Sequence, residues 1–215
     1  MKPKFTAALF DLDGVLVDTA KYHYLAWKNL ARSLGFDFTE QDNERLKGVS
    51  RLRSLEILLE IGSLAFDEAV KTCLAVQKNE EYVDYIRRLD ESEILPGAKE
   101  CLQALRARGV SIALGSASKN SPMILSRLKI IDLFDALIDG NKTAKAKPDP
   151  QVFLLGAQAL GVSPSDCVVF EDAEAGIQAA KAAGMFAVGI GNPDVLSGAN
   201  IIISGLHEFD VDSLF

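Results

Sequence analysis

Short apolar runs alternate with amphipathic segments along most of the chain. Six runs rich in aliphatic and β-branched residues have the length and composition of buried strands, and they span 5–10, 109–116, 135–138, 167–170, 185–191 and 200–204. Four segments between these runs repeat apolar residues at helical spacing, at 95–109, 121–128, 149–161 and 173–184. Strands that alternate with amphipathic helices predict an α/β fold, a parallel sheet with helices on both faces.

The ends of these helices carry recognisable signals. Ser121 followed by Pro122 predicts an N-cap and a first turn, and Asp149 with Pro150 predicts the same for the next helix. Gly161 stands where that second helix is expected to end.

Residues 20 to 90 interrupt the alternation, because their pattern is helical throughout. Four helices are predicted, over 22–35, 38–48, 50–62 and 67–89, and Thr39 with Asp42 has roughly the spacing of a capping box. We therefore expect an inserted all-helical cap domain at 19–90, over the ligand edge of a discontinuous core formed by 1–18 and 91–215. One continuous fold with extra helices is the alternative, and it leaves the long insertion unexplained.

Composition and charge exclude several classes of function. The 215 residues carry a net charge of −7, which argues against a nucleic-acid binder with a broad basic face. The sequence has no run apolar enough for a membrane span and no signal-peptide pattern, so we expect a cytoplasmic protein without a membrane partner. The cysteines Cys73, Cys101 and Cys167 lie far apart in apolar stretches, which predicts buried thiols rather than a disulfide or a zinc site.

Polar residues follow four of the predicted strands at the point where each strand ends. Asp11 and Asp13 follow the first strand, residues 116–120 the second, Lys142, Lys145 and Lys147 the third, and Glu171 and Asp172 the fourth. Each group alone has an ordinary explanation as a turn, a helix cap or a solvated lysine. Because ligands bind beyond the carboxyl ends of the strands in open parallel sheets, their joint placement predicts a binding crevice.

Converging carboxylates with hydroxyls and a lysine suit Mg²⁺ bound together with a phosphate group. Asp11 can attack phosphorus to form an aspartyl-phosphate, and Asp13 can serve as general acid and base for the leaving or entering hydroxyl. Ser116 and Lys147 would hold and neutralise the oxygens of the transferring phosphoryl group. These residues predict phosphoryl-transfer chemistry.

Four segments, "FDLDGVLVDT", "GSASKN", "KPDP" and "FEDAEAGIQAAKAAG", resemble in order the four motifs of the haloacid-dehalogenase superfamily. The resemblance implies a Rossmann-like core, a helical cap for an insertion at this point, and Mg²⁺ bound by Asp11, the Asp13 backbone carbonyl, Glu171 and Asp172. In that superfamily an acid two residues after the nucleophile marks the phosphoryl-transfer branch, so Asp13 argues against dehalogenation.

Within that superfamily, "DTAKYHYLAWKNLA", "LKGVSRLRSLEILL" and "QKNEEYV" resemble the β-phosphoglucomutase family, and the similarity extends over nearly the whole chain. The resemblance implies an isomerase that interconverts β-D-glucose 1-phosphate and glucose 6-phosphate, with glucose 1,6-bisphosphate as intermediate and activator. Sugar phosphates are then the expected partners of a monomer. The implied substrate-binding residues are Thr19, His23, Trp27, Lys47, Gly48, Val49, Ser50, Arg51, Lys78, Ala117, Ser118, Lys119 and Asn120.

Several of these residues also have an ordinary structural interpretation. Trp27 is expected to pack in the core, His23 fits packing and ligand binding equally well, and Lys78 is expected to be exposed. Arg51 opens a helix, where a cation opposes the helix dipole, and this favours a ligand role. Lys145 and Lys147 are both candidates for the phosphate lysine, and the position of Lys147 before a proline favours it.

Two other functions stay open. A phosphatase for sugar phosphates or phosphoglycolate would use the same core with water as the acceptor, and it would not need a second cationic clamp for phosphate. A non-catalytic, metal-dependent phosphosugar sensor would bind without turnover, although no residue of the four motifs is missing.

Overall fold

The structure, a computed structural model, describes residues 5–46 and 49–215, so the predicted binding residues Lys47 and Gly48 lie outside the described residues. Six parallel strands form one sheet in the order β3-β2-β1-β4-β5-β6. The strands are β1 (Ala7–Phe10), β2 (Ser111–Gly115), β3 (Ala136–Ile138), β4 (Cys167–Glu171), β5 (Phe186–Ile190) and β6 (Ile201–Ile203). All six predicted strands are present, and the predicted Rossmann-like α/β fold is confirmed.

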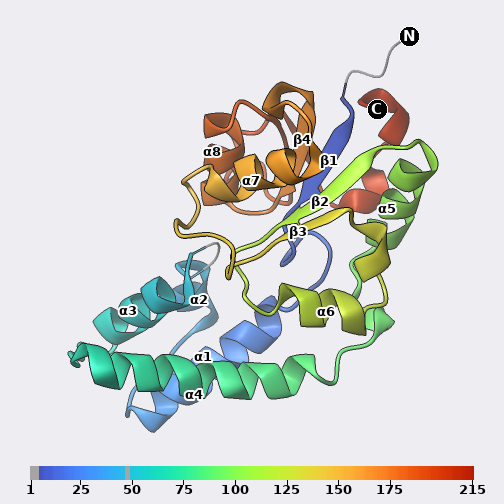
Figure 1. The fold of residues 1–215 in the computed structure, drawn as a ribbon. Coiled ribbons are helices and arrows are strands. Elements are labelled where there is room, and N and C mark those ends of the chain that lie inside the picture. The colour runs from blue at the N-terminus through green and yellow to red at the C-terminus, as the bar shows by residue number, and fades with distance from the viewer. Residues whose placement is uncertain (1–4, 47–48) are drawn as a thin grey trace.

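Helices cover both faces of the sheet, with α5 and α6 on one face and α7 and α8 on the other (Figure 1). Their bounds are α5 (Ala98–Ala107), α6 (Ser121–Arg127), α7 (Gln151–Leu160) and α8 (Glu174–Ala182). Along β1, Ala8 and Phe10 join the hydrophobic cluster on one face, whereas Ala7 and Leu9 join the cluster on the other. A strand buried on both faces needs apolar residues at every position, which explains its unbroken apolar run.

Four further helices form one group beyond the carboxyl end of β1 (Figure 1), and we call residues 19–90 the helical segment. Its helices are α1 (Ala20–Ser33), α2 (Glu40–Glu44), α3 (Arg51–Ile61) and α4 (Glu68–Ile86). Between residues 20 and 90, the described part of the chain contains no strand, as predicted. The predicted capping box at Thr39 and Asp42 is present at the start of α2. The segment has a hydrophobic cluster of its own, which includes Trp27 and Phe38.

Single turns of 3-10 helix complete the chain. They are η1 (Glu91–Glu93), η2 (Ile131–Leu133), η3 (Pro164–Asp166), η4 (Leu206–Glu208) and η5 (Val211–Ser213). η1 follows the helical segment directly, and Glu93 in it accepts hydrogen bonds from Lys21 Nζ at 2.6 Å and from the Tyr22 hydroxyl at 2.8 Å. These contacts join the two ends of the helical segment where it meets the sheet.

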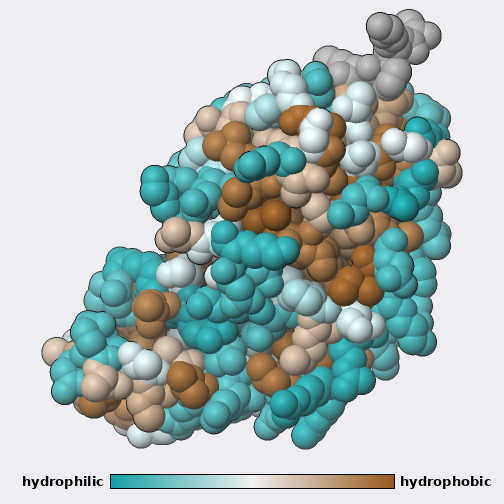
Figure 2. Space-filling model, in the orientation of Figure 1, coloured by the Kyte–Doolittle hydropathy of each residue, from teal (hydrophilic) through white to brown (hydrophobic). Residues whose placement is uncertain are grey.

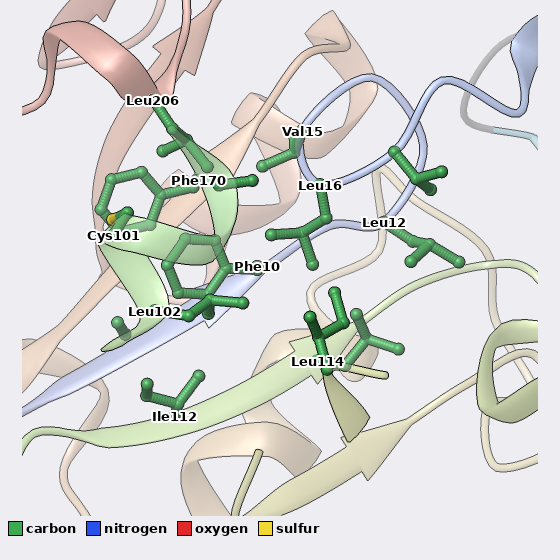
Figure 3. Close-up of a cluster of buried hydrophobic side chains, with 14 of the residues drawn as sticks. Phe10, Leu12, Val15, Leu16, Cys101, Leu102, Ile112, Leu114, Phe170 and Leu206 are labelled. Carbon is green, nitrogen blue, oxygen red and sulfur yellow. The ribbon is translucent and has the colours of Figure 1, made fainter. Parts of the chain in front are cut away.

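A hydrophobic cluster supports the loop that follows β1 (Figure 3). Phe10 stacks on Phe170 of the neighbouring β4, with ring centroids 4.5 Å apart. Leu12 and Val15 extend from the loop into the same cluster, and both are fully buried. Because these apolar anchors flank Asp13 on both sides, the loop is held firmly at the end of the sheet.

The sheet has a free edge at β3, and Figure 2 shows apolar residues gathered on the surface of that region. Ile131, Phe134 and Leu137 line a hollow beside this strand. Lys142 Nζ donates to the Leu137 carbonyl at 2.6 Å, which occupies one acceptor of the edge and protects it against strand addition. None of the helices in the described residues has the length and apolarity needed to cross a membrane.

One of the three cysteines differs from expectation. Cys101 and Cys167 are buried as predicted, but the prediction for Cys73 is wrong, because this residue lies on the outward side of α4 and is exposed.

The N-cap of α6 is Asn120 rather than Ser121. Ser121 forms the first turn instead, where its hydroxyl donates to the Ser118 carbonyl at 2.8 Å. At the start of α7 the cap position falls on Pro150, and the Asp149 carboxylate still accepts from a first-turn N–H.

Candidate active site

The end of β1 lies at the point where the strand order of the sheet reverses. β1 pairs with β2 on one side and with β4 on the other, so connections leave it in opposite directions and open a crevice. Asp11 is the first residue after β1, and its N–H donates to the Phe170 carbonyl at 3.0 Å. The backbone of Asp11 is therefore fixed at this end of the sheet.

A buried lysine joins two of the predicted carboxylates. Lys147 Nζ donates to Asp11 Oδ1 at 2.5 Å and to Glu171 Oε2 at 2.8 Å, and its side chain is 2% exposed. Burial opposes the charge of this lysine, but the two carboxylates outweigh burial and raise its pKa. Lys145 is largely exposed and pairs with Asp149, so the geometry favours Lys147, as the sequence did.

Three carboxylates converge in a way that suits a hard cation. One oxygen each from Asp11, Glu171 and Asp172 lies within 4.8 Å of the others. Mg²⁺ prefers oxygen ligands of this kind and keeps places for phosphate oxygens and water. Two glycines leave space for these carboxylates. An added Cβ at Gly14 would overlap the Asp172 carboxylate, and an added Cβ at Gly176 would overlap the Glu171 carboxylate.

Gly176→Ala should therefore weaken Mg²⁺ binding by roughly 10–100-fold, the usual effect of disturbing residues behind metal ligands. In an ordinary helix this change is stabilising, but in α8 the new methyl group would displace Glu171. Titration calorimetry with Mg²⁺ measures the effect. Gly198→Ala is the control, since its Cβ would make only ordinary contact at 3.5 Å. Equal Mg²⁺ affinity in wild type and Gly176→Ala would contradict this account of the metal site.

Asp13 is placed differently from the other acids. Its Oδ1 is buried and has no hydrogen-bond partner among the described residues. Burial, followed by the negative charges of Asp11 and Asp172, raises the pKa of Asp13 well above its usual value. A carboxyl group with a raised pKa beside a candidate nucleophile is suited to donate and accept a proton.

The loop after β2 supplies the predicted hydroxyl and amide groups. Ser116 is buried at the end of β2, and its Oγ accepts from Ser118 N–H at 3.1 Å, which leaves its own hydroxyl hydrogen available to a ligand. Ser118 Oγ accepts in turn from Asn120 N–H at 3.3 Å. Ala117 and Ser118 are partly buried, whereas Lys119 is exposed at the rim.

On the helical segment, α1 and α4 bring a second group of predicted residues together. Lys78 Nζ lies 2.7 Å from His23 Nδ1 and 4.5 Å from the centre of the Trp27 ring. It also lies 4.8 Å from the centre of the Tyr82 ring, and the His23 ring stacks on Tyr82 with centroids 3.9 Å apart. The expected exposure of Lys78 is wrong, because these rings enclose it and leave it 3% exposed.

Burial and mutual repulsion lower the basicity of this group. Burial first, and then the charges of Lys78 and Arg51, lower the pKa of His23 well below its usual value. Burial and Arg51 lower the pKa of Lys78 to about 7, against the opposing pull of Asp13 and Glu81. At pH 7 the positive charge of this group is therefore carried by Arg51 and in part by Lys78, beside a neutral His23, and an anion bound there would stabilise the charged form of Lys78.

The remaining predicted residues of the helical segment are placed as follows. Thr19 is fully buried at the N-cap of α1, where no side-chain capping bond forms. Ser50 caps α3 by accepting from Arg53 N–H at 3.4 Å, and partly buried Arg51 begins that helix. Val49 packs against the cluster of the helical segment, which also contains Trp27, so a packing role is observed for both residues.

Sequence reasoning missed two residues that the structure brings to this region. Asn79 Oδ1 accepts from Asn120 Nδ2 at 3.1 Å and so connects α4 with the loop after β2. Tyr82 is fully buried beneath His23 and Lys78. Asn79 directly follows Lys78 and Tyr82 lies one helical turn after it, and these positions on the same helix were the signal in the sequence.

The sequence that carries these carboxylates and the lysine matches a known family. The haloacid dehalogenase-like hydrolase family matches residues 5–184. The chain belongs to this family. Members of the haloacid dehalogenase-like family that resemble it closely include β-phosphoglucomutase of Bacillus subtilis (strain 168), which is 45% identical over 97% of this chain and 93% of its own length.

Other proteins similar to this chain carry the name of a mutase or of a phosphatase. A β-phosphoglucomutase structure from Clostridium difficile superposes with a TM-score of 0.94 and 41% identity, over 97% of this chain and 95% of its own. A phosphorylated carbohydrates phosphatase of Thermotoga maritima is 33% identical over 83% of this chain and 82% of its own length.

Proposed function

We propose that this protein is a β-phosphoglucomutase, an enzyme that interconverts β-D-glucose 1-phosphate and glucose 6-phosphate. The observation that carries the proposal is the group of buried Lys78 and partly buried Arg51 beside His23, which lies on the helical segment, where Lys78 is close enough to feel the charge of Asp13. A mutase must hold two phosphates at once, one at the reacting carboxylate and one at the far end of the sugar. The similarity to two β-phosphoglucomutases over nearly the whole chain supports the same conclusion.

The proposed chemistry assigns a role to each core residue. A carboxylate oxygen of Asp11 attacks the phosphorus of a sugar bisphosphate, and the bond between phosphorus and the sugar oxygen breaks as Asp13 protonates that oxygen. Asp13 then takes the proton from the 6-hydroxyl of β-glucose 1-phosphate, whose oxygen attacks the aspartyl-phosphate. Lys147 and Ser116 hold the transferring phosphoryl oxygens.

The metal and the activator follow from the same proposal. Asp11, the Asp13 carbonyl, Glu171 and Asp172 would hold Mg²⁺, which supplies charge neutralisation at the phosphoryl group. Glucose 1,6-bisphosphate would start the cycle as activator by phosphorylating Asp11. After each transfer the bisphosphate reorients in the site so that its 1-phosphate faces Asp11. It transfers this 1-phosphate to Asp11, and the product that leaves is glucose 6-phosphate.

We further propose that residues 19–90 act as a cap on a core formed by 1–18 and 91–215. The predicted cap ligands Thr19, His23, Trp27, Val49, Ser50, Arg51 and Lys78, with Lys47 and Gly48, would close on the loop of Ala117, Ser118, Lys119 and Asn120. Closure would exclude water, which competes with the sugar hydroxyl as acceptor. A monomer located in the cytoplasm is expected, and analytical ultracentrifugation tests the first part of this statement.

A sugar-phosphate phosphatase is the second candidate, because the Thermotoga maritima relative carries that activity in its name. One reaction separates the two. The protein is incubated with β-glucose 1-phosphate, Mg²⁺ and a trace of glucose 1,6-bisphosphate, and glucose 6-phosphate and free phosphate are followed together. Glucose 6-phosphate far ahead of free phosphate supports the mutase. Free phosphate with little glucose 6-phosphate identifies a phosphatase and overturns the proposal.

Lys78→Met should separate stability from substrate binding. Methionine fills the same space without a buried charge, so the free energy of unfolding at pH 7 should rise by about 1–4 kcal/mol. The pKa of Lys78 falls from 10.5 to about 7 on folding, so the unfavourable effect of the lysine is complete below pH 7 and fades as pH approaches 10.5. The gain of the variant over wild type should shrink over the same range, as measured by urea unfolding.

The same variant should raise the KM for β-glucose 1-phosphate by roughly 10-fold or more, because a charge-assisted contact to phosphate is lost. Lys71→Met on the same helix is the control, since Lys71 forms an ion pair with the exposed Glu68. A Lys78→Met protein that is less stable than wild type at pH 7, or that keeps its KM, would contradict the assignment.

A further inference from the structure

A side chain at the start of α7 holds the stretch of chain that leads to Lys147. Gln151 is the first residue of α7, four positions after Lys147. Its Oε1 accepts hydrogen bonds from the backbone N–H of Ala144 and from that of Lys145, both at 2.8 Å. One side-chain oxygen therefore ties two consecutive peptide groups to the helix, just before the chain reaches the buried lysine.

Further contacts close the same stretch into a turn. The N–H of Asp149 donates to the Ala146 carbonyl at 3.0 Å, and Asp149 Oδ1 accepts from the N–H of Gln151 at 3.0 Å. Lys145 Nζ lies 3.2 Å from Asp149 Oδ2. Lys147 lies inside this turn, so the two bonds to the Gln151 amide oxygen fix the point from which the lysine side chain starts.

The same helix also places the far end of the lysine. Phe153, two positions after Gln151, is fully buried, and the Lys147 ammonium lies 4.9 Å from the centre of its ring. Gly115 at the end of β2 leaves room for this ring, because an added Cβ there would lie 2.9 Å from it. An ammonium with carboxylate partners at 2.5 and 2.8 Å has little room to move, so a shift of its backbone would reach the carboxylates.

We propose that Gln151 is a positioning residue for Lys147, and that it acts through the acceptor oxygen of its amide. The inference rests on the proposed function, because it takes Lys147 to neutralise the oxygens of the transferring phosphoryl group. The alternative is a purely structural role, in which Gln151 only stabilises the start of α7. The two roles differ in what they predict for the rate of phosphoryl transfer.

Gln151→Met and Gln151→Glu separate the acceptor oxygen from the shape of the side chain. Methionine has a similar length but only a weak acceptor, so phosphorylation of Asp11 should slow by roughly 10–100-fold as Lys147 loses its position. Glutamate keeps an oxygen that can accept from both N–H groups, so its rate should be close to that of wild type. Gln158→Met is the control, because Gln158 is exposed on the same helix.

Acetyl phosphate measures this step without a sugar. A carboxylate oxygen of Asp11 attacks phosphorus, the bond between phosphorus and the acetyl oxygen breaks, and acetate leaves with the electron pair. Mass spectrometry of the intact protein measures phosphorylation, and release of acetate measures turnover where water then removes the phosphoryl group. Ala144 and Lys145 are exposed, so water can replace the lost acceptor, and the melting temperature of Gln151→Met should change little. A purely structural role predicts the reverse, a lower melting temperature at an unchanged rate.

A double-mutant cycle tests whether the glutamine acts through the lysine. In the Lys147→Met background, Gln151→Met should slow phosphorylation no further, because residues that act as a unit have non-additive effects. The inference is overturned by equal slowing in both backgrounds, by a wild-type rate in Gln151→Met, or by a Gln151→Glu protein as slow as Gln151→Met. A wild-type protein that reacts with acetyl phosphate but forms no glucose 6-phosphate would overturn the mutase instead, and the cycle would still test the role of Gln151.

Discussion

Asp11→Asn should lower the rate of glucose 6-phosphate formation by roughly 10⁴-fold or more, the scale of loss when a nucleophile is removed. The amide has the shape of the carboxylate but cannot form the acyl phosphate. Lys147 keeps its bond to Glu171 at 2.8 Å, so its charge stays paired and the fold should persist. A coupled assay for glucose 6-phosphate measures the rate, and intact-protein mass spectrometry after treatment with acetyl phosphate measures phosphorylation.

Asp18→Asn is the matched control for this experiment. It makes the same chemical change in the same motif, at a partly buried residue that follows the loop carrying Asp11 and Asp13. We expect it to retain most of the activity and the phosphorylation signal. If Asp11→Asn still took up a phosphoryl group, another residue would be the nucleophile, and the roles assigned to the core carboxylates would have to change.

The sheet was predictable because its strands obey a simple rule. Buried parallel strands are apolar at every position, so β1 and β4 stand out in the sequence, and the residues after them must meet at one edge. For this reason Asp11 and Glu171 could be placed near each other although 160 positions separate them. The ends of the strands were less predictable, since the apolar run at 5–10 begins two residues before β1 does.

The helical segment was predictable only as a set of helices. Its sequence indicates where each helix begins, as at Thr39, but not which faces of α1 and α4 pack together. Lys78 therefore looked exposed, because nothing local reveals that His23, 55 positions away, lies against it. Tyr82 was missed for a related reason: an aromatic residue one turn from another candidate is most simply interpreted as packing, and only the structure shows that His23 and Lys78 lie against its ring.

The choice between Lys145 and Lys147 illustrates what burial adds to a motif. Both lysines lie in the loop after β3, and spacing alone leaves either one possible. In the structure one side chain is 68% exposed and the other 2% exposed. A lysine that keeps its charge when buried needs carboxylates to balance it, and Lys147 bonds to Asp11 and Glu171, so the buried residue belongs to the carboxylate cluster.

Lys147→Met should therefore damage both stability and activity. Methionine is of similar length but leaves Asp11 and Glu171 buried without their cation, and Asp13 and Asp172 add repulsion. We expect the free energy of unfolding in the presence of a chelator to fall by about 3–5 kcal/mol, as when one partner of a buried ion pair is removed. The rate should fall by roughly 10²–10³-fold, because the charge that we propose to stabilise the transferring phosphoryl group is lost.

Mg²⁺ distinguishes this mechanism from simple loss of packing. The ion brings positive charge to the same carboxylates, so it should raise the melting temperature of Lys147→Met by more than it raises that of wild type. Lys145→Met is the control, since its exposed pair with Asp149 contributes less than about 1 kcal/mol. If Mg²⁺ stabilised Lys147→Met no more than wild type, the lysine and the metal would not share one site, and the cluster would serve the fold rather than phosphoryl transfer.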